Sequence, residues 1–360
     1  LHAVLDVIHA VAGHAGAPRT FRMQPVMIPV PAAARQPTRW QALWRDALRD
    51  PVELLEGLGL PELARRVSAS AQAQFPLRVP RGFVDRMRRG DPHDPLLRQV
   101  LPLDDEDRVV PGFGLDAVGD AAAKGGTGVI HKYDGRALLI ATGSCAIHCR
   151  YCFRRHFPYA EETAAAGGWA SALDYLRADP SVREVILSGG DPLSLSTAKL
   201  AELTDALRGL PQITRLRIHT RLPIVLPERI DDEFLDWIGA LPWPVVMVVH
   251  ANHANEIDDG VRAACASLRA RGVHLLNQAV LMRGVNDSAD ALVDLSEALF
   301  ASGVLPYYLP LLDRVHGTAH FDVPEPEALA LRDAIHARLP GYLVPRLVRE
   351  IAGEPGKTPR

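Results

Sequence analysis

Six short apolar segments, spaced fairly evenly over residues 136–312, constrain the fold more than any other feature of the sequence. They read RALLIATG, VREVILSGG, ITRLRIHT, PVVMVVH, VHLLNQAVL and VLPYYLPLL, and helix-like segments such as AKLAELTDALRGL lie between them. Strands this apolar on both faces belong in a buried parallel sheet. The repeated strand and helix units predict an α/β fold, a partial (β/α)6 barrel, with an open doubly wound sheet as the alternative.

Polar residues follow each of these six segments. In chain order they are Cys145, Gly189 with Asp191, Thr220 with Arg221, His250 with Asn252, Asn277 with Gln278, and Asp313. The carboxyl ends of the strands meet at one face of such a barrel, and chemistry gathers there. The sequence therefore predicts a single shared mouth.

The rest of the chain divides into segments that differ in composition and hydrophobic pattern. Residues 1–36 are predicted to be a disordered leader, because a Pro/Ala-rich bridge precedes the first amphipathic pattern. Residues 37–127 form a predicted helical region, which begins with Trp40, Leu43, Trp44 and Leu48 at helical spacing. Residues 128–322 are the predicted barrel, and residues 323–360 a C-terminal segment.

Composition restricts the classes of partner. The 360 residues are 48% hydrophobic with a net charge of -3, and Lys and Arg are spread along the chain. This pattern argues against a nucleic-acid surface and against a basic membrane patch. No uncharged run approaches the length of a bilayer span, so we expect a soluble protein that acts on a small polar molecule.

Three of the four cysteines, Cys145, Cys149 and Cys152, lie in the eight-residue stretch CAIHCRYC. A structural zinc site is the alternative explanation, but such a site is closed by a fourth Cys or His. Three thiolates instead suit a [4Fe-4S] cluster that has one iron open to a ligand. The CxxxCxxC spacing with Tyr151 before the last cysteine resembles the signature of the radical S-adenosylmethionine (SAM) superfamily. Cys265 lies in a helical segment and is predicted to be an ordinary buried thiol.

A wider resemblance covers nearly all of residues 38–360. KYDGRALL, LSGGDPL, RLPIVLP, HANHANE, NQAVLMRGVND, PYYLPLLD and GEPGK resemble the lysine 2,3-aminomutase family of radical SAM enzymes. CRYCFRRHFPY and LVREIAGEPGKTP are most similar to its bacterial branch that serves β-lysylation of elongation factor P. The family fold is a radical SAM partial barrel, here with an N-terminal helical extension.

The resemblance implies three cofactors and the residues that hold them. Lys357 corresponds to the lysine that carries pyridoxal phosphate (PLP), Tyr133 to the tyrosine that stacks on its ring, and Arg136 to the arginine that binds its phosphate. A guanidinium suits phosphate because its donors meet two oxygens at once. The cysteines would hold the cluster, and the predicted SAM contacts are Gly189, Gly190, Asp191, His250 and Gln278.

The resemblance also implies a substrate site. Arg154 matches the arginine that binds the carboxylate of lysine, and Asp313 matches an acid that holds the far ammonium. Glu350 stands where free-lysine aminomutases have Asp, so the resemblance leaves open whether free or protein-bound lysine is used. Arg155 and His156 are expected to stabilise the cysteine loop.

The predicted activity is a PLP-dependent radical SAM isomerisation of lysine to β-lysine by 2,3-amino migration, which supplies elongation factor P modification. A catabolic or biosynthetic lysine 2,3-aminomutase is the rival within the class, and a non-catalytic metal-binding protein is the rival outside it. The cluster would need an external electron donor. Its sensitivity to oxygen favours the cytoplasm.

Overall fold

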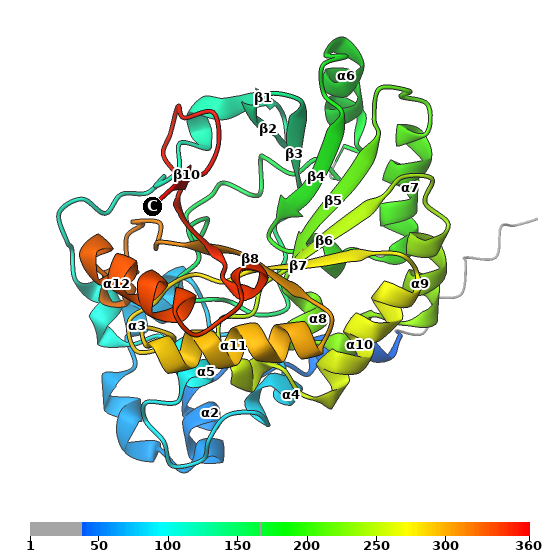
Figure 1. Cartoon of the computed structure of the whole chain (residues 1–360). Helices are drawn as coiled ribbons and strands as arrows, with labels where there is room; N and C mark the ends of the chain where they lie inside the picture. The colour runs from blue at the N-terminus through cyan, green and yellow to red at the C-terminus, as the bar shows by residue number, and fades with distance from the viewer. Residues whose placement is uncertain (1–37, 166) are drawn as a thin grey trace, which may run out of the picture. The chain divides into compact units, whose positions relative to one another are not determined.

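A ten-stranded sheet is the centre of the computed structural model, which describes residues 38–165 and 167–360. The predicted leader, residues 1–36, therefore lies outside the described residues. The strands follow one another in chain order: β1 (Lys124–Gly126), β2 (Val129–Tyr133), β3 (Arg136–Thr142), β4 (Glu184–Gly189), β5 (Arg215–Thr220), β6 (Val245–Val249), β7 (His274–Gln278), β8 (Leu305–Pro310), β9 (Arg346–Arg349) and β10 (Thr358–Pro359). Figure 1 shows the fan that they form.

Strands β3 to β9 run parallel, whereas β1 to β3 and the pair β9 and β10 are antiparallel. The six predicted parallel strands correspond to β3 to β8, so the predicted α/β partial barrel is confirmed. The sequence did not predict β9, a seventh parallel strand, or the hairpin that it forms with β10.

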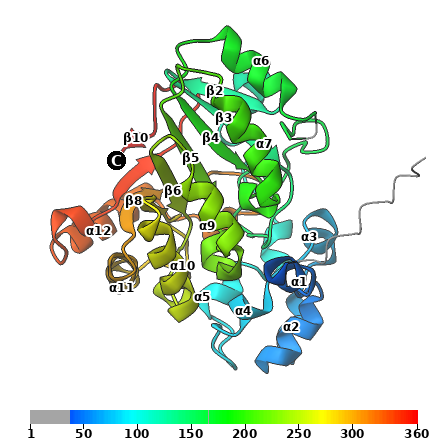
Figure 2. The same ribbon diagram turned by 90° about the vertical axis from the view of Figure 1, so that its right-hand side faces the viewer.

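Helices connect the parallel strands and cover the outer side of the sheet, as Figures 1 and 2 show. These are α6 (Ala170–Ala178), α7 (Thr197–Leu207), α8 (Leu222–Val225), α9 (Asp232–Gly239), α10 (Asp259–Ala270), α11 (Ala289–Ala301) and α12 (Glu325–His336). Ser196, Asp258 and Ser288 begin three of them by accepting a hydrogen bond from a backbone N–H of the first turn. The predicted burial of Cys265 is confirmed, because it lies in α10 with no exposed surface.

Between residue 38 and the sheet lie five short α-helices: α1 (Arg39–Arg45), α2 (Pro51–Leu58), α3 (Ala69–Gln74), α4 (Arg81–Val84) and α5 (Pro95–Arg98). The 3-10 turns are Pro61–Arg66, Asp104–Asp107, Ala121–Ala123, Pro192–Ser194, Pro227–Arg229, Ala254–Glu256, Ala319–Phe321 and Gly341–Leu343. Leu48, predicted to be helical, instead forms an antiparallel bridge with Val79, because α1 ends before Asp46.

The helical region and the sheet share one hydrophobic core. Leu54 and Phe83 from the helices belong to the same buried cluster as Leu139, Leu187 and Ile218 from the strands. The predicted boundaries between residues 127 and 128 and between 322 and 323 stay predictions. None of the helices described here is long and apolar enough to cross a membrane.

Candidate active site

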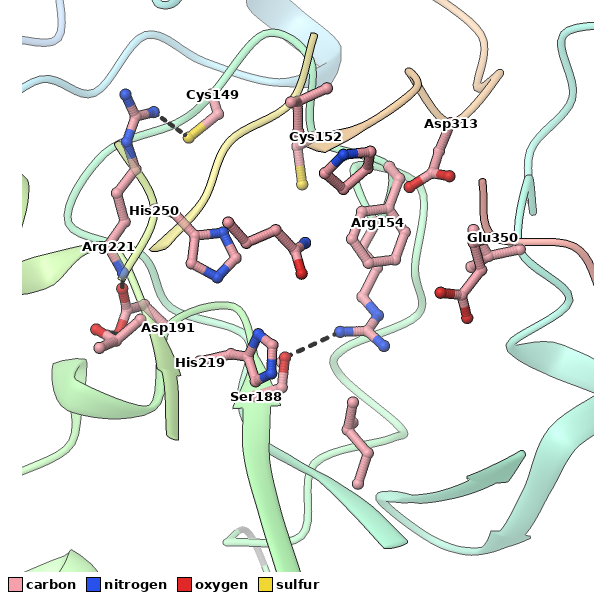
Figure 3. Close-up of a pocket in the computed structure, with 18 of the residues that line it drawn as sticks. Cys149, Cys152, Arg154, Ser188, Asp191, His219, Arg221, His250, Asp313 and Glu350 are labelled. Atoms are coloured by element: carbon pink, nitrogen blue, oxygen red, sulfur yellow. Dashed lines mark hydrogen bonds between the residues drawn. The ribbon is translucent and has the colours of Figure 1, made fainter. Parts of the chain in front are cut away.

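A cavity of about 320 Å³ opens at the carboxyl ends of the parallel strands. The fourteen predicted site residues all line it: Tyr133, Arg136, Cys145, Cys149, Cys152, Arg154, Gly189, Gly190, Asp191, His250, Gln278, Asp313, Glu350 and Lys357. Ten residues of its wall are labelled in Figure 3. The structure thus brings the cysteine loop together with a lysine more than 200 residues further along the chain.

The three cysteines lie on the loop that follows β3, and Cys149 and Cys152 point into the cavity in Figure 3. Burial and repulsion from the other thiols raise the pKa of Cys145 and raise that of Cys152 to about 11. Among the described residues, no three His, Cys, Asp or Glu side chains gather closely enough for a single metal ion. Three soft sulfur donors on one cavity wall fit a [4Fe-4S] cluster, whose iron would hold them as thiolates.

The N-terminal region holds the cysteine loop in place. Arg150 has no exposed surface, and both of its donors to the Glu106 carboxylate are 2.6 Å from an oxygen. Arg155 donates to the same carboxylate at 2.6 Å, which agrees with the stabilising role expected for it. The backbone N–H groups of His148 and Arg150 also donate to carbonyls of the helical region. Sequence reasoning missed Glu106, which lies in an acidic run that looks solvent-exposed.

Two glycines allow the end of β4 to approach the cysteine loop. Gly189 has a φ of +120°, and a Cβ there would lie 2.6 Å from the carbonyl oxygen of Thr142. A Cβ on Gly190 would lie 2.6 Å from the carbonyl oxygen of Ser144. Both positions therefore require glycine for packing, in addition to the predicted contact with SAM.

Asp191 joins the ends of β4 and β5. Its buried carboxylate accepts hydrogen bonds from the Thr220 hydroxyl at 2.6 Å and from the backbone N–H groups of Leu193, Arg221 and Leu222. Burial nevertheless raises the pKa of Asp191 to about 6. Sequence reasoning missed this positioning role, and the predicted contact of Asp191 with SAM stays a prediction.

Two side chains present unpaired polar atoms to the cavity. Within the described residues, His250 Nε2 and Gln278 Oε1 are buried without a hydrogen-bond partner. Burial lowers the pKa of His250 to about 3, so its imidazole is neutral. His219, which was not predicted, packs edge-to-face on it with 5.6 Å between ring centroids. A polar ligand such as SAM would satisfy these atoms.

The hairpin of β9 and β10 positions Lys357, because Thr358 pairs with Arg349 across it. Lys357 Nζ lies 2.6 Å from Glu350 Oε2, and the Tyr133 hydroxyl donates to Glu350 Oε1 at 2.7 Å. Burial alone would raise the pKa of Glu350, but Lys357 and Tyr133 hold it below its usual value. An amine, a tyrosine and an arginine on one wall fit PLP, and the Arg136 guanidinium lies 4.6 Å from the Tyr133 ring centroid.

A chain of ion pairs connects Arg154 to Glu350 through two residues that were not predicted. Arg154 donates to Asp120 at 2.7 Å and to Ser188 at 3.1 Å (Figure 3 shows the latter bond). Lys132 Nζ lies 2.7 Å from Asp120 Oδ1 and 3.4 Å from Glu350 Oε1. Sequence reasoning missed both Asp120 and Lys132. They connect the predicted carboxylate-binding arginine to the acid that contacts Lys357.

Asp313 lies at the same side of the cavity as Glu350 in Figure 3. Burial raises the pKa of Asp313 to about 6, although the positive charge of Lys357 acts in the opposite direction. A ligand ammonium would stabilise the charged form of this carboxylate. The geometry is compatible with the predicted role of Asp313.

Comparison with known proteins identifies the family. The chain is 48% identical to the L-lysine 2,3-aminomutase of Escherichia coli K12 over 89% of this chain and 94% of that protein. It is 46% identical to the Haemophilus influenzae protein of the same name, over 92% and 98% respectively.

No protein-family model matches the chain. A radical SAM methyltransferase from Sphaerobacter thermophilus aligns with 61% of this chain and 68% of its own, at 17% identity and a TM-score of 0.45. The assignment to a family rests on the two sequence relatives, because their identity and coverage are high. The chain belongs to the L-lysine 2,3-aminomutase family, and as a member of it is an isomerase that works with a [4Fe-4S] cluster, S-adenosylmethionine and pyridoxal phosphate.

Proposed function

We propose that this enzyme converts L-lysine to β-lysine by moving the amino group from C2 to C3. The observation that carries the proposal is the shared cavity, which is lined by Lys357, the three cysteines and Arg154. A radical reaction on an amino acid held by PLP requires both cofactors to reach one substrate. A single shared cavity meets that requirement.

When bound, the cluster with SAM supplies an organic radical, and PLP supplies the carbonyl group that holds the amine. The chain's own residues bind and orient. The Arg154 guanidinium suits the substrate carboxylate, because its planar fork meets two oxygens. Asp313 and Glu350 carry the negative charge that suits the far ammonium, and the enclosing walls exclude water that would quench a radical.

The direct test is incubation of the reconstituted enzyme with lysine, SAM, PLP and a reductant under nitrogen, followed by chromatography. We expect β-lysine, and brown protein with about four irons per chain. Protein that binds the cluster and PLP but forms no β-lysine would contradict the substrate. Colourless protein with one zinc ion would instead support the non-catalytic metal-binding alternative.

Asp313→Asn is expected to raise the KM for lysine roughly 10- to 100-fold, with a smaller change in kcat. The amide keeps the shape of the carboxylate but loses the charge, and a hydrogen bond to a charged group contributes about 1.5–3 kcal/mol. Steady-state kinetics measures the effect. Asp322→Asn is a matched control, because Asp322 pairs with Arg314 and does not line the cavity. An unchanged KM in Asp313→Asn would exclude it as an ammonium ligand.

The biological setting is a separate part of the proposal. The likeness of CRYCFRRHFPY and LVREIAGEPGKTP to the elongation factor P branch supports a role in modifying that factor, in the cytoplasm, with an external electron donor. Deleting the gene should remove the β-lysyl group from elongation factor P, as measured by mass spectrometry. An unchanged mass would favour a catabolic or biosynthetic aminomutase.

A further inference from the structure

Arg221 contacts one of the three cysteines, Cys149. Its Nη1 is 2.8 Å from Cys149 Sγ, and Figure 3 shows the guanidinium pointing at that sulfur. Among the described residues, Cys149 Sγ accepts a hydrogen bond, whereas the sulfurs of Cys145 and Cys152 accept none. The three sulfurs are therefore not equivalent.

The rest of the Arg221 side chain is fixed in place. Nη2 donates to Gln99 Oε1 at 2.6 Å and to Glu256 Oε2 at 2.9 Å, and the residue is only 6% exposed. The rings of Phe83 and Tyr151 flank the guanidinium at 5.5 and 5.6 Å. These contacts hold the guanidinium beside the sulfur.

One donor of Arg221 is unused. Within the described residues, its Nε is buried without a hydrogen-bond partner, and Arg221 lines the cavity. A buried unpaired N–H is costly, so this donor is available to an acceptor bound in the cavity. The inorganic sulfide of a cluster is an acceptor of suitable chemistry.

Hydrogen bonds to the sulfurs help to set the reduction potential of an iron–sulfur cluster. They stabilise the reduced form more than the oxidised form, because reduction adds negative charge to the sulfurs. Glu256 pairs with Arg221 at 2.9 Å and partly offsets its positive charge, so we expect Arg221 to act mainly through its hydrogen bond to Cys149. We propose that Arg221 is a positioning residue that raises the reduction potential of the cluster through its hydrogen bond to Cys149. This inference rests on the proposed function only in assuming that the cysteines bind a [4Fe-4S] cluster.

The test is a redox titration of the cluster monitored by electron paramagnetic resonance, without lysine or PLP. Arg221→Gln is expected to lower the ratio of reduced to oxidised cluster tenfold at a fixed potential, which is about 59 mV for one electron. Arg78→Gln is the matched control. Arg78 also lies beside the cysteine loop, but it donates to the Trp44 carbonyl and to no thiol. Equal shifts in both variants, or no shift in Arg221→Gln, would overturn the proposal.

Arg221→Gln could fail to assemble the cluster, and a second measurement covers that case. In the intact enzyme labelled with [15N]arginine, the reduced cluster should show a magnetic coupling to guanidinium nitrogen that Arg78→Gln retains. Absence of this coupling overturns the proposal. An intact enzyme that binds no cluster at all would count against the proposed function itself, so the two failures are distinguishable.

Discussion

Lys357→Ala is expected to abolish the absorbance of covalently bound PLP and to reduce β-lysine formation about a thousandfold or more, as for other groups that bond to the substrate or cofactor. Lys132 also lines the cavity, but we do not expect it to substitute, because its ammonium contacts the Val118 carbonyl, Asp120 and Glu350. Borohydride reduction followed by peptide mass spectrometry measures the site of attachment.

Two controls separate this effect from misfolding. Lys124→Ala removes a lysine that pairs with Glu162 away from the cavity, and it should retain the PLP absorbance. The iron content of Lys357→Ala should match that of the parent enzyme, because the cysteine loop is a different segment of the chain. A reduced PLP adduct on any other lysine of the parent enzyme would contradict the assignment of Lys357.

Glu106→Ala is expected to lower the free energy of unfolding by about 3–5 kcal/mol. The side chains of Arg150 and Arg155 are at most 2% exposed, and both depend on this carboxylate. Its removal leaves two buried positive charges without their counter-charge, and their repulsion would loosen the cysteine loop. Urea denaturation of the full chain measures the stability, and iron analysis the loop.

The neighbouring Asp104 provides the control. It pairs with Arg66, but these side chains are 54% and 46% exposed, so Asp104→Ala should cost only about 0–1 kcal/mol. If the two variants lost similar stability, the buried cluster of Glu106, Arg150 and Arg155 would contribute no more to the free energy of unfolding than an exposed ion pair does.

The apolar segments predicted the six central strands of the barrel but not the strands at its ends. The six strands β3 to β8 were identifiable because their apolar runs are buried on both faces. Strand β9 escaped prediction, because RLVR is short and carries two arginines. Leu48 shows the converse error: helical spacing continued past the point where α1 ends, and only pairing with Val79 decides its conformation.

The site residues also divide into those that the sequence predicted and those that it did not. Residues in compact motifs, such as the cysteine loop and Gly189–Asp191, could be named from the sequence because neighbours in the chain stay neighbours in space. The roles of Glu106, Asp120 and Lys132 could not be predicted, since each acts through a partner distant in sequence. Arg221 was expected at the mouth of the barrel, but its contact with Cys149 was not. Arg221 and Gln99, for example, are 122 positions apart. Charge alone does not reveal such pairings.

The two-residue strand β10 follows Lys357 at the outer edge of the sheet, where Arg360 N–H donates to the Leu347 carbonyl. A two-residue pair at the edge of a sheet opens more easily than a central strand, because it has few backbone hydrogen bonds and little buried apolar contact. Each opening would withdraw the amine while the cysteine loop stays folded. We therefore expect the exchange rate of the cofactor to depend on how often β10 separates from β9.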